Sequence, residues 1–172
     1  KEFEFALTEY NINYDWNPHD PRQATNVGAV WAASVINHLA KAGHDIAMTW
    51  HSKGGGTFGL VSNTNEIRPM AELIYLLNKY LRNAALLPVD EGDQKVEILA
   101  ARKGKRGIVL LINKYPEAQV VRLTITEDKK LRSPLTKDVC QIEISDAGPY
   151  TQKNIHFFEE GENYGTVTMP PY

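Results

Sequence analysis

Short apolar segments of strand length alternate with longer segments of helical periodicity along the first half of the chain. In residues 3–8, apolar side chains alternate with polar or small ones, which is the two-residue period of a β-strand. A loop rich in Asn, Asp and Pro follows, and Asp20 and Pro21 then provide a helix N-cap and a first helical residue. The pattern therefore predicts a strand that ends near Tyr10 and a helix that begins at Pro21.

The same order of strand and helix occurs a second time. The first helical pattern ends at Gly43, and residues 45–50 are a short, nearly all-apolar segment, as a parallel strand covered on both faces requires. A Gly-rich loop follows at 51–59, and Pro69 opens a second helix with an apolar stripe. Two successive βα units of about 40 residues predict a parallel α/β sheet or barrel, whose active sites gather at the C-terminal ends of the strands.

The helical period ends at about residue 83, and the rest of the sequence has the pattern of an all-β module. Turn sequences join strand-length segments at 96–102, 107–113, 119–125, 139–144, 153–158 and 164–169. These segments predict an antiparallel sheet or a small sandwich. We therefore divide the chain into an α/β part, residues 1–82, and a β part, residues 83–172.

The α/β part is not expected to be stable alone. A two-stranded parallel sheet leaves apolar faces and unpaired edges in water. The chain also begins within a strand pattern, without an initiator Met or a signal peptide. We therefore expect residues 1–82 to be the end of a larger α/β domain, completed by further sequence, by another polypeptide or by self-association.

Composition and charge limit the classes of partner. Of the 172 residues, 42% are hydrophobic and 23% are charged, as in ordinary globular proteins. The 19 basic and 21 acidic residues give a net charge of −2, so there is no basic field to attract nucleic acid or anionic lipid. No apolar run approaches the roughly 20 residues of a membrane helix. The sequence therefore predicts no nucleic-acid partner and no membrane association.

Metal and phosphate chemistry also lack support in the sequence. The five histidines and the single cysteine, Cys140, show no metal-ligand spacing. The glycine run at 54–56 lacks the spacing and the Lys-Ser/Thr of a P-loop. We predict no metal and no cofactor, and we expect Cys140 to be a small buried residue of its strand.

Candidate functional residues lie at the C-terminal ends of the two predicted parallel strands. Glu9 sits beside Tyr10 and Asn11 at the first strand end, where barrel enzymes keep nucleophiles and general bases. Trp50 and His51 end the second strand, where an aromatic ring can stack on a sugar and a histidine can hydrogen-bond its hydroxyl groups. Position alone also allows Glu9 to be a solvated loop residue and Trp50 to plug a barrel mouth.

Several short motifs together resemble the last two βα units of a clan A retaining glycoside hydrolase. They are Phe-Ala-Leu-Thr-Glu-Tyr-Asn at 5–11, Ile-Ala-Met-Thr-Trp at 46–50, Gly-Thr-Phe-Gly-Leu at 56–60 and Arg-Pro-Met-Ala-Glu at 68–72. The resemblance is greatest to the β-xylosidase and α-iduronidase type and to the α-arabinofuranosidases. It implies that residues 1–82 are the C-terminal βαβα part of a (β/α)8 TIM barrel. It also implies that residues 83–172 are a β-sandwich, in a chain truncated at both ends.

The resemblance implies that Glu9 is the catalytic nucleophile, which forms a covalent glycosyl-enzyme. The residues that it implies for binding the carbohydrate substrate are Tyr10, Asn11, Trp50 and His51. A retaining mechanism needs a second carboxyl group about 5 Å away as acid/base. In such enzymes this group is the Glu of an Asn-Glu pair at the end of the fourth strand. The pair at 65–66 lies in a loop instead, so the isolated chain is expected to have negligible glycosidase activity.

Two functions from different classes remain open. The first is a glycosidase that hydrolyses O-glycosidic bonds in poly- or oligosaccharides, whose barrel is completed by the same or a separate polypeptide. The alternative is a non-catalytic carbohydrate-binding or structural β-sandwich module with a barrel remnant, in which Glu9 is dispensable. The resemblance suggests an extracellular or periplasmic location for the parent enzyme.

Overall fold

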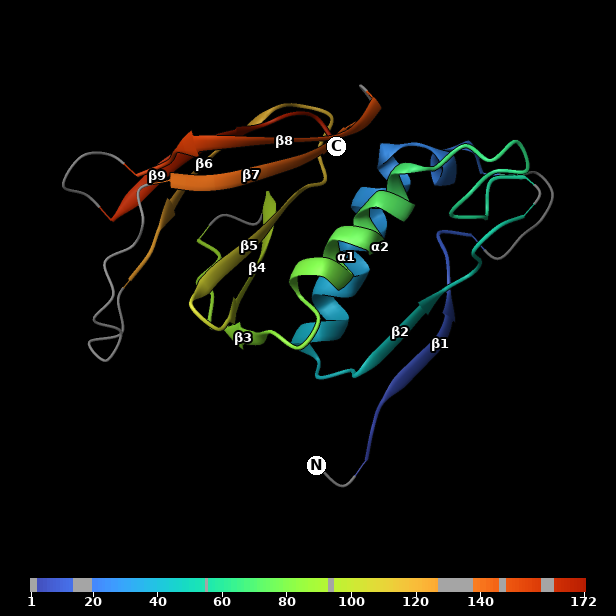
Figure 1. Ribbon diagram of the computed structural model, residues 1–172, viewed down its shortest axis with the longest axis horizontal. Coiled ribbons are helices and arrows are strands. Elements are labelled where there is room, and N and C mark those ends of the chain that lie inside the picture. Colours follow the sequence, from blue (N-terminus) through green and yellow to red (C-terminus); the bar gives the residue numbers. More distant parts are fainter. Residues whose placement is uncertain are drawn as a thin grey trace.

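The described residues of the N-terminal part form two parallel strands, a short 3-10 helix and two α-helices (Figure 1). The computed structural model describes residues 3–13, 20–54, 56–92, 95–126, 138–145, 148–158 and 163–172. In chain order, the N-terminal elements are β1 (Ala6–Tyr10), the 3-10 helix η1 (Pro21–Ala24), α1 (Asn26–Lys41), β2 (Ile46–Thr49) and α2 (Pro69–Tyr80). The predicted order of strand, helix, strand and helix is confirmed, as is the parallel pairing of β1 with β2.

The chemistry of the flanking residues sets both helix starts. Asp20 Oδ1 accepts the backbone N–H of Arg22 at 3.0 Å, and Pro21 occupies the first position, as predicted. This first turn is a separate 3-10 helix, because the extended backbone of Thr25 interrupts it before α1 begins. The second helix begins at Pro69, where the sequence predicts it.

The described residues of the C-terminal part form antiparallel sheets. The strands are β3 (Ala85–Leu87), β4 (Val96–Lys103), β5 (Arg106–Asn113), β6 (Gln119–Thr124), β7 (Asp138–Ser145), β8 (Gly148–His156) and β9 (Tyr164–Met169). They pair in the orders β3-β4-β5, β6-β9 and β7-β8. The sequence pattern predicts all of them except the short β3, although β8 begins at Gly148 rather than at residue 153.

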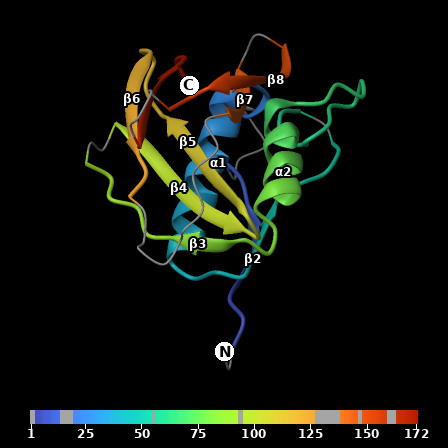
Figure 2. The same ribbon diagram turned by 60° about the vertical axis from the view of Figure 1, so that its left-hand side comes forward.

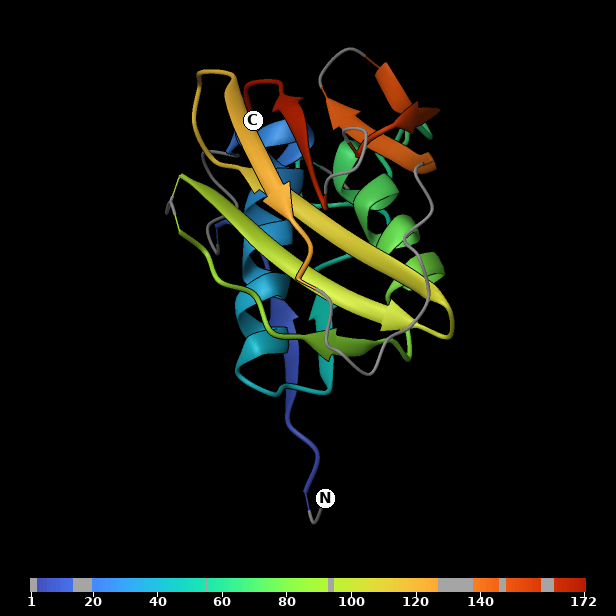
Figure 3. The same cartoon turned by 90° about the vertical axis from the view of Figure 1, so that its left-hand side faces the viewer.

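The two helices lie between the parallel strands and the β-rich part of the molecule (Figure 1). Seen from two other directions, β4 and β5 run across the helices, and β6 to β9 lie toward the upper end of the molecule (Figure 2 and Figure 3). The buried residues of the shared hydrophobic core are Ala29, Ala32 and Ala33 of α1, Met70 and Leu73 of α2, and Ile112 of β5. Because alanine has a small side chain, α1 can pack closely against its neighbours. One core thus connects the helices to the β-rich part.

A buried carboxylate adds a polar connection between these parts. Glu97 of β4 is only 7% exposed, and its carboxylate accepts hydrogen bonds from Ser34 Oγ at 3.0 Å and Asn37 Nδ2 at 3.3 Å. His38 Nε2 lies 3.3 Å from the same carboxylate, and the Lys114 ammonium forms an ion pair with it. Burial raises the pKa of Glu97, but the hydrogen bonds from Lys114, Ser34 and Asn37 outweigh burial and lower this pKa to about 2. The ionised carboxylate therefore holds α1 against β4.

Replacing this carboxylate is expected to reduce stability in a pH-dependent way. The pKa of Glu97 is about 2 in the fold, against an ordinary value of 4.5, so the carboxylate stabilises the fold above about pH 4.5. Its contribution is lost as the pH falls from about 4.5 towards 2. We expect Glu97→Gln to lower the free energy of unfolding at pH 7 by about 2 kcal/mol, measured by urea denaturation.

The exposed Glu117 provides the matched control. Glu117→Gln is expected to change the free energy of unfolding by less than about 0.5 kcal/mol. Equal effects of the two substitutions at pH 7, or an unchanged difference between them at pH 2.5, would contradict this role of Glu97.

The β1–β2 pair is covered on one face by the helices. On this face the Tyr10 ring lies 6.0 Å from the ring of Trp31 in α1, and Thr49 Oγ1 donates to Met70 Sδ in α2 at 3.6 Å. Tyr10 and Thr49 are partners in the parallel register, so strand alternation directs their neighbours to the opposite face. We call this opposite face the open face, and it carries Glu9, Ile46, Met48 and Trp50.

The open face exposes apolar side chains. Ile46 is 43% exposed, Met48 is 48% exposed and Trp50 is 42% exposed. Within the described residues, β1 and β2 each have the other as their single strand neighbour. The apolar segment at 45–50 was predicted to be a strand covered on both faces. In the described residues the helices cover one face of it, and the other face is exposed.

Cys140 differs from its expected environment. It is exposed on β7, so the expectation of a small buried residue is wrong. Ile144, near the other end of the same strand, packs against the core that the helices share with β5. Among the described residues of β7, Ile144 packs against this core and Cys140 does not, so a strand-like sequence alone does not bury the cysteine.

Candidate functional site

The C-terminal end of the open face brings together two of the predicted site residues. Glu9 directly precedes Tyr10 in β1, and Trp50 directly follows Thr49 of β2. The Trp50 N–H donates to the Tyr10 carbonyl at 2.9 Å, which joins the two strand ends. Glu9 and Trp50 are both exposed, and strand alternation places them on the same side of the pair. A carboxylate and an indole ring therefore border one surface.

Asn11 connects these strand ends to the loop that follows. Its Nδ2 donates to the Trp50 carbonyl, and also to the Phe58 carbonyl at 3.4 Å. Its Oδ1 accepts the backbone N–H of Ile12 at 2.7 Å. Both ends of the side-chain amide therefore bind backbone groups. In this structure Asn11 orients Trp50, whereas the family resemblance implies that it binds substrate.

The side chain of Tyr10 points away from those of Glu9 and Trp50. Its ring packs beside Trp31 on the helix-covered face, and its hydroxyl is buried with no hydrogen-bonding partner among the described residues. Burial raises the pKa of this hydroxyl. A shift in the β1–β2 register between Leu7 and Tyr10 accompanies this orientation. The structure therefore places the Tyr10 side chain on the opposite face of the strand pair from the side chains of Glu9 and Trp50.

His51 lies against the ring of Trp50. The two ring centroids are 5.2 Å apart and the rings are inclined by 23°, and the peptide bond between the two residues is cis. The imidazole also fills the space beside Gly54, where an added Cβ atom would lie 2.1 Å from His51 Nε2. His51 thus packs between Trp50 and the Gly-rich loop, and it supports the indole ring from one side.

The Gly-rich loop is held by contacts that the sequence pattern does not predict. The backbone N–H groups of Leu60 and Val61 donate to the carbonyls of residues 51 and 52 at 2.9 and 3.0 Å. Thr57 Oγ1 donates to Oε1 of the buried Gln23 at 3.3 Å. The guanidinium of the buried Arg68 donates to carbonyls of the loop. No sequence signal marks these roles, because a glutamine in a helical turn and an arginine before a helix are ordinary surface residues in most sequences.

The arrangement offers a carboxylate beside an aromatic surface. The described residues contain no group of three or more His, Cys, Asp or Glu side chains that is able to hold a metal ion. In the same part of the chain, no helix has the length and apolar character needed to cross a lipid bilayer. The chemistry available at the open face is therefore that of Glu9 and of ring stacking on Trp50.

Comparison with known proteins finds similarity at the level of structure. No family model matches the chain, and no curated protein matches it significantly. The fold superposes on Xyn30A from Clostridium acetobutylicum, a glycoside hydrolase family 30 subfamily 8 xylanase, with a TM-score of 0.75 and 13% identity, over 98% of this chain and 40% of that chain.

Two further glycoside hydrolases have a similar fold. A family 30 endoxylanase from Clostridium papyrosolvens superposes with a TM-score of 0.70 and 14% identity, over 98% of this chain and 39% of that chain. A family 86 β-porphyranase from the human gut bacterium Bacteroides plebeius gives a TM-score of 0.62 and 11% identity, over 98% of this chain and 33% of that chain. The chain therefore has a fold that occurs in glycoside hydrolases, and it spans 40% or less of their length.

The close packing of the Gly-rich loop yields a test of its structure. A Cβ atom at Gly59 would lie 2.7 Å from both the Gly54 N and the Val61 O, and backbone atoms held in hydrogen-bonded turns cannot easily move away. We expect Gly59→Ala to lower the free energy of unfolding by about 2 kcal/mol, measured by urea denaturation. Gly92 has open space around its Cα, so Gly92→Ala should change stability by less than about 0.5 kcal/mol. If Gly59→Ala is equally harmless, the loop does not pack as described.

Proposed function

We propose that this chain is the nucleophile-bearing part of a retaining glycosidase. Residues 1–82 are then the last two βα units of a (β/α)8 barrel, and residues 83–172 are the β-sandwich that follows it. The observation that carries the proposal is the position of Glu9 and Trp50 on the open face, at the C-terminal ends of two parallel strands. The fold similarity to two xylanases and a porphyranase supports the same class of enzyme.

In the proposed reaction Glu9 attacks the anomeric carbon of the sugar. The bond from this carbon to the leaving oxygen breaks, and a second carboxyl group about 5 Å away protonates that oxygen. Water, deprotonated by the second group, then displaces Glu9 and releases the sugar with its anomeric configuration retained. Trp50 presents an indole face on which the C–H groups of a sugar ring can stack. His51 supports this ring, and Asn11 fixes its backbone.

The proposal also assigns a partner to the open face. Parallel strands occur almost only in sheets whose two faces are both covered, whereas Ile46 and Met48 are exposed here. Further βα units, in the same or in a separate polypeptide, would cover this face, extend the sheet and supply the acid/base carboxyl group. The isolated 172-residue chain is accordingly expected to show negligible turnover of aryl glycosides.

Covalent trapping tests the role of Glu9. The product of the complete gene is incubated with 2,4-dinitrophenyl 2-deoxy-2-fluoro-β-xyloside, whose electron-withdrawing fluorine disfavours the oxocarbenium-like transition state and so slows release of a glycosyl-enzyme. We expect one added sugar per active site, located by peptide mass spectrometry on Glu9. Glu9→Gln should prevent labelling and lower kcat/KM for an aryl β-xyloside by about 10⁴-fold.

The exposed Glu4 lies just upstream in the same segment and provides the matched control. Glu4→Gln should leave both labelling and turnover unchanged. If the protein binds sugar without turnover, and Glu9→Gln binds it with the same affinity, the protein is a non-catalytic carbohydrate-binding module and the proposed enzyme is wrong. Labelling at a carboxylate other than Glu9 would also contradict the proposed role.

A further inference from the structure

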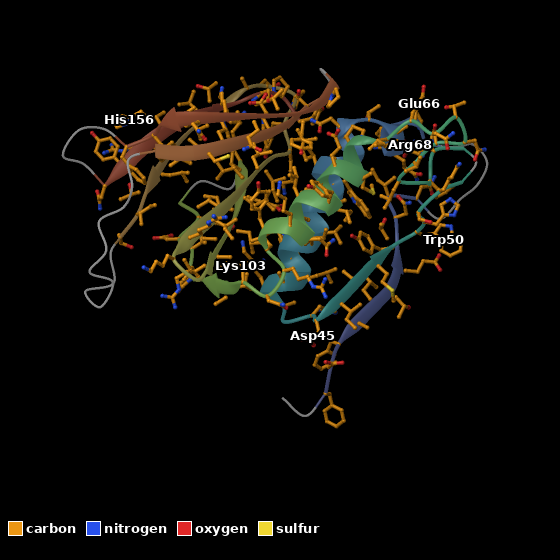
Figure 4. The ribbon with its side chains drawn as sticks, in the orientation of Figure 1. Asp45, Trp50, Glu66, Arg68, Lys103 and His156 are labelled. Carbon is orange, nitrogen blue, oxygen red and sulfur yellow. The ribbon has the colours of Figure 1, made fainter. Side chains whose placement is uncertain are left out.

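A buried guanidinium lies behind the Gly-rich loop. Arg68 directly precedes α2 and is only 8% exposed. Its NH1 group donates to the carbonyl of Gly59 at 2.6 Å and to that of Thr57, and its NH2 group donates to the carbonyl of Gly56 at 2.6 Å. Arg68 and Trp50 lie at the same end of the molecule, whereas Asp45 lies at the other end of β2 (Figure 4). One side chain therefore binds three carbonyls of the loop beside the open face.

A contribution to the stability of the fold does not by itself explain why a charged side chain is buried at position 68. Burial lowers the pKa of its guanidinium, and the charge of Glu66 offsets part of this effect. Among the described residues, no carboxylate lies within ion-pair distance of Arg68. An unpaired charge is expensive to bury, and an apolar side chain of similar volume would fill the same space. A guanidinium differs in having a rigid, planar set of donors that can hold several acceptors in a fixed geometry.

The loop that Arg68 binds is connected to Trp50 at two points. Phe58 is buried in the loop, and its carbonyl accepts a hydrogen bond from the Asn11 amide that also donates to the Trp50 carbonyl. The Leu60 N–H donates at 2.9 Å to the carbonyl of His51, whose ring stacks on Trp50. A shift of the loop would therefore move both the backbone and the stacking partner of the indole ring.

We infer that Arg68 is a positioning residue for the sugar-binding surface of the site. It fixes the loop at 56–59 through three carbonyls, and the loop in turn holds Trp50 in one orientation on the open face. This role rests on the proposed function, because it concerns the surface on which a sugar would stack. It extends that proposal, because the fixed orientation of Trp50 then depends on a residue that touches neither the sugar nor Glu9.

Hydrogen exchange and tryptophan fluorescence of the product of the complete gene test this role without any sugar. Arg68→Met removes all three hydrogen bonds, and Arg68→Lys keeps the charge but cannot bind three carbonyls in one plane. We expect the amides of Leu60 and Val61 to exchange at least about tenfold faster in Arg68→Met and by a smaller factor in Arg68→Lys. The Trp50 emission, obtained by subtracting the spectrum of the same variant carrying Trp50→Phe, should shift to longer wavelength in both. The amides of the β4–β5 hairpin should remain protected.

Arg82 is exposed at the other end of α2, and Arg82→Met serves as the control that should change neither signal. Unchanged loop exchange and Trp50 emission in both Arg68 variants would overturn the inference. So would a loss of protection that is equal in the loop and in the β4–β5 hairpin, since this would indicate a general loss of stability. If Arg68→Met does not fold, Arg68→Lys alone decides. Failure of Glu9 to be labelled would refute the proposed function without affecting these signals.

Discussion

A pair of parallel β-strands leaves apolar side chains in water unless both of its faces are covered. In this protein α1 and α2 cover one face of the β1–β2 pair, through contacts such as Tyr10 with Trp31 and Thr49 with Met70. The open face carries the exposed Ile46, Met48 and Trp50 at its surface. Strand alternation places Glu9 on this same face, at the C-terminal end of β1. The face that lacks cover is therefore also the face that carries the proposed nucleophile.

The helices that support this site are themselves held from behind by the β-rich part. Small alanines of α1 and apolar residues of α2 share a core with Ile112 of β5, and the ionised Glu97 binds three side chains of α1. A buried carboxylate of this kind is stable only when its hydrogen bonds are complete, so it also fixes the relative position of helix and strand. The C-terminal part thus contributes to the site by keeping its scaffold rigid, at a distance from Glu9.

Periodicity predicted the elements of this fold better than it predicted the site. Alternating and helical patterns, together with Pro21 and Pro69, were sufficient for the βαβα order and for most later strands. They could not reveal the register shift between Leu7 and Tyr10, which accompanies the orientation of the Tyr10 ring toward the helices. An alternating sequence pattern gives no sign of such a shift. Nor could they show that Asn11 binds two backbone carbonyls, or that Arg68 binds three. The Asn11 contacts join segments about 40 residues apart in the chain, and the Arg68 contacts surround a loop. Both therefore depend on tertiary packing.

The most direct test of this account is the native mass of the protein produced from its complete gene, combined with hydrogen exchange of β1 and β2. The account predicts that further polypeptide covers the open face. The native particle should therefore be heavier than the 19.4 kDa of this chain, and the amides of both strands should be protected. A lone 19.4 kDa particle that unfolds cooperatively, with Ile46 and Met48 still exposed to water, would contradict it.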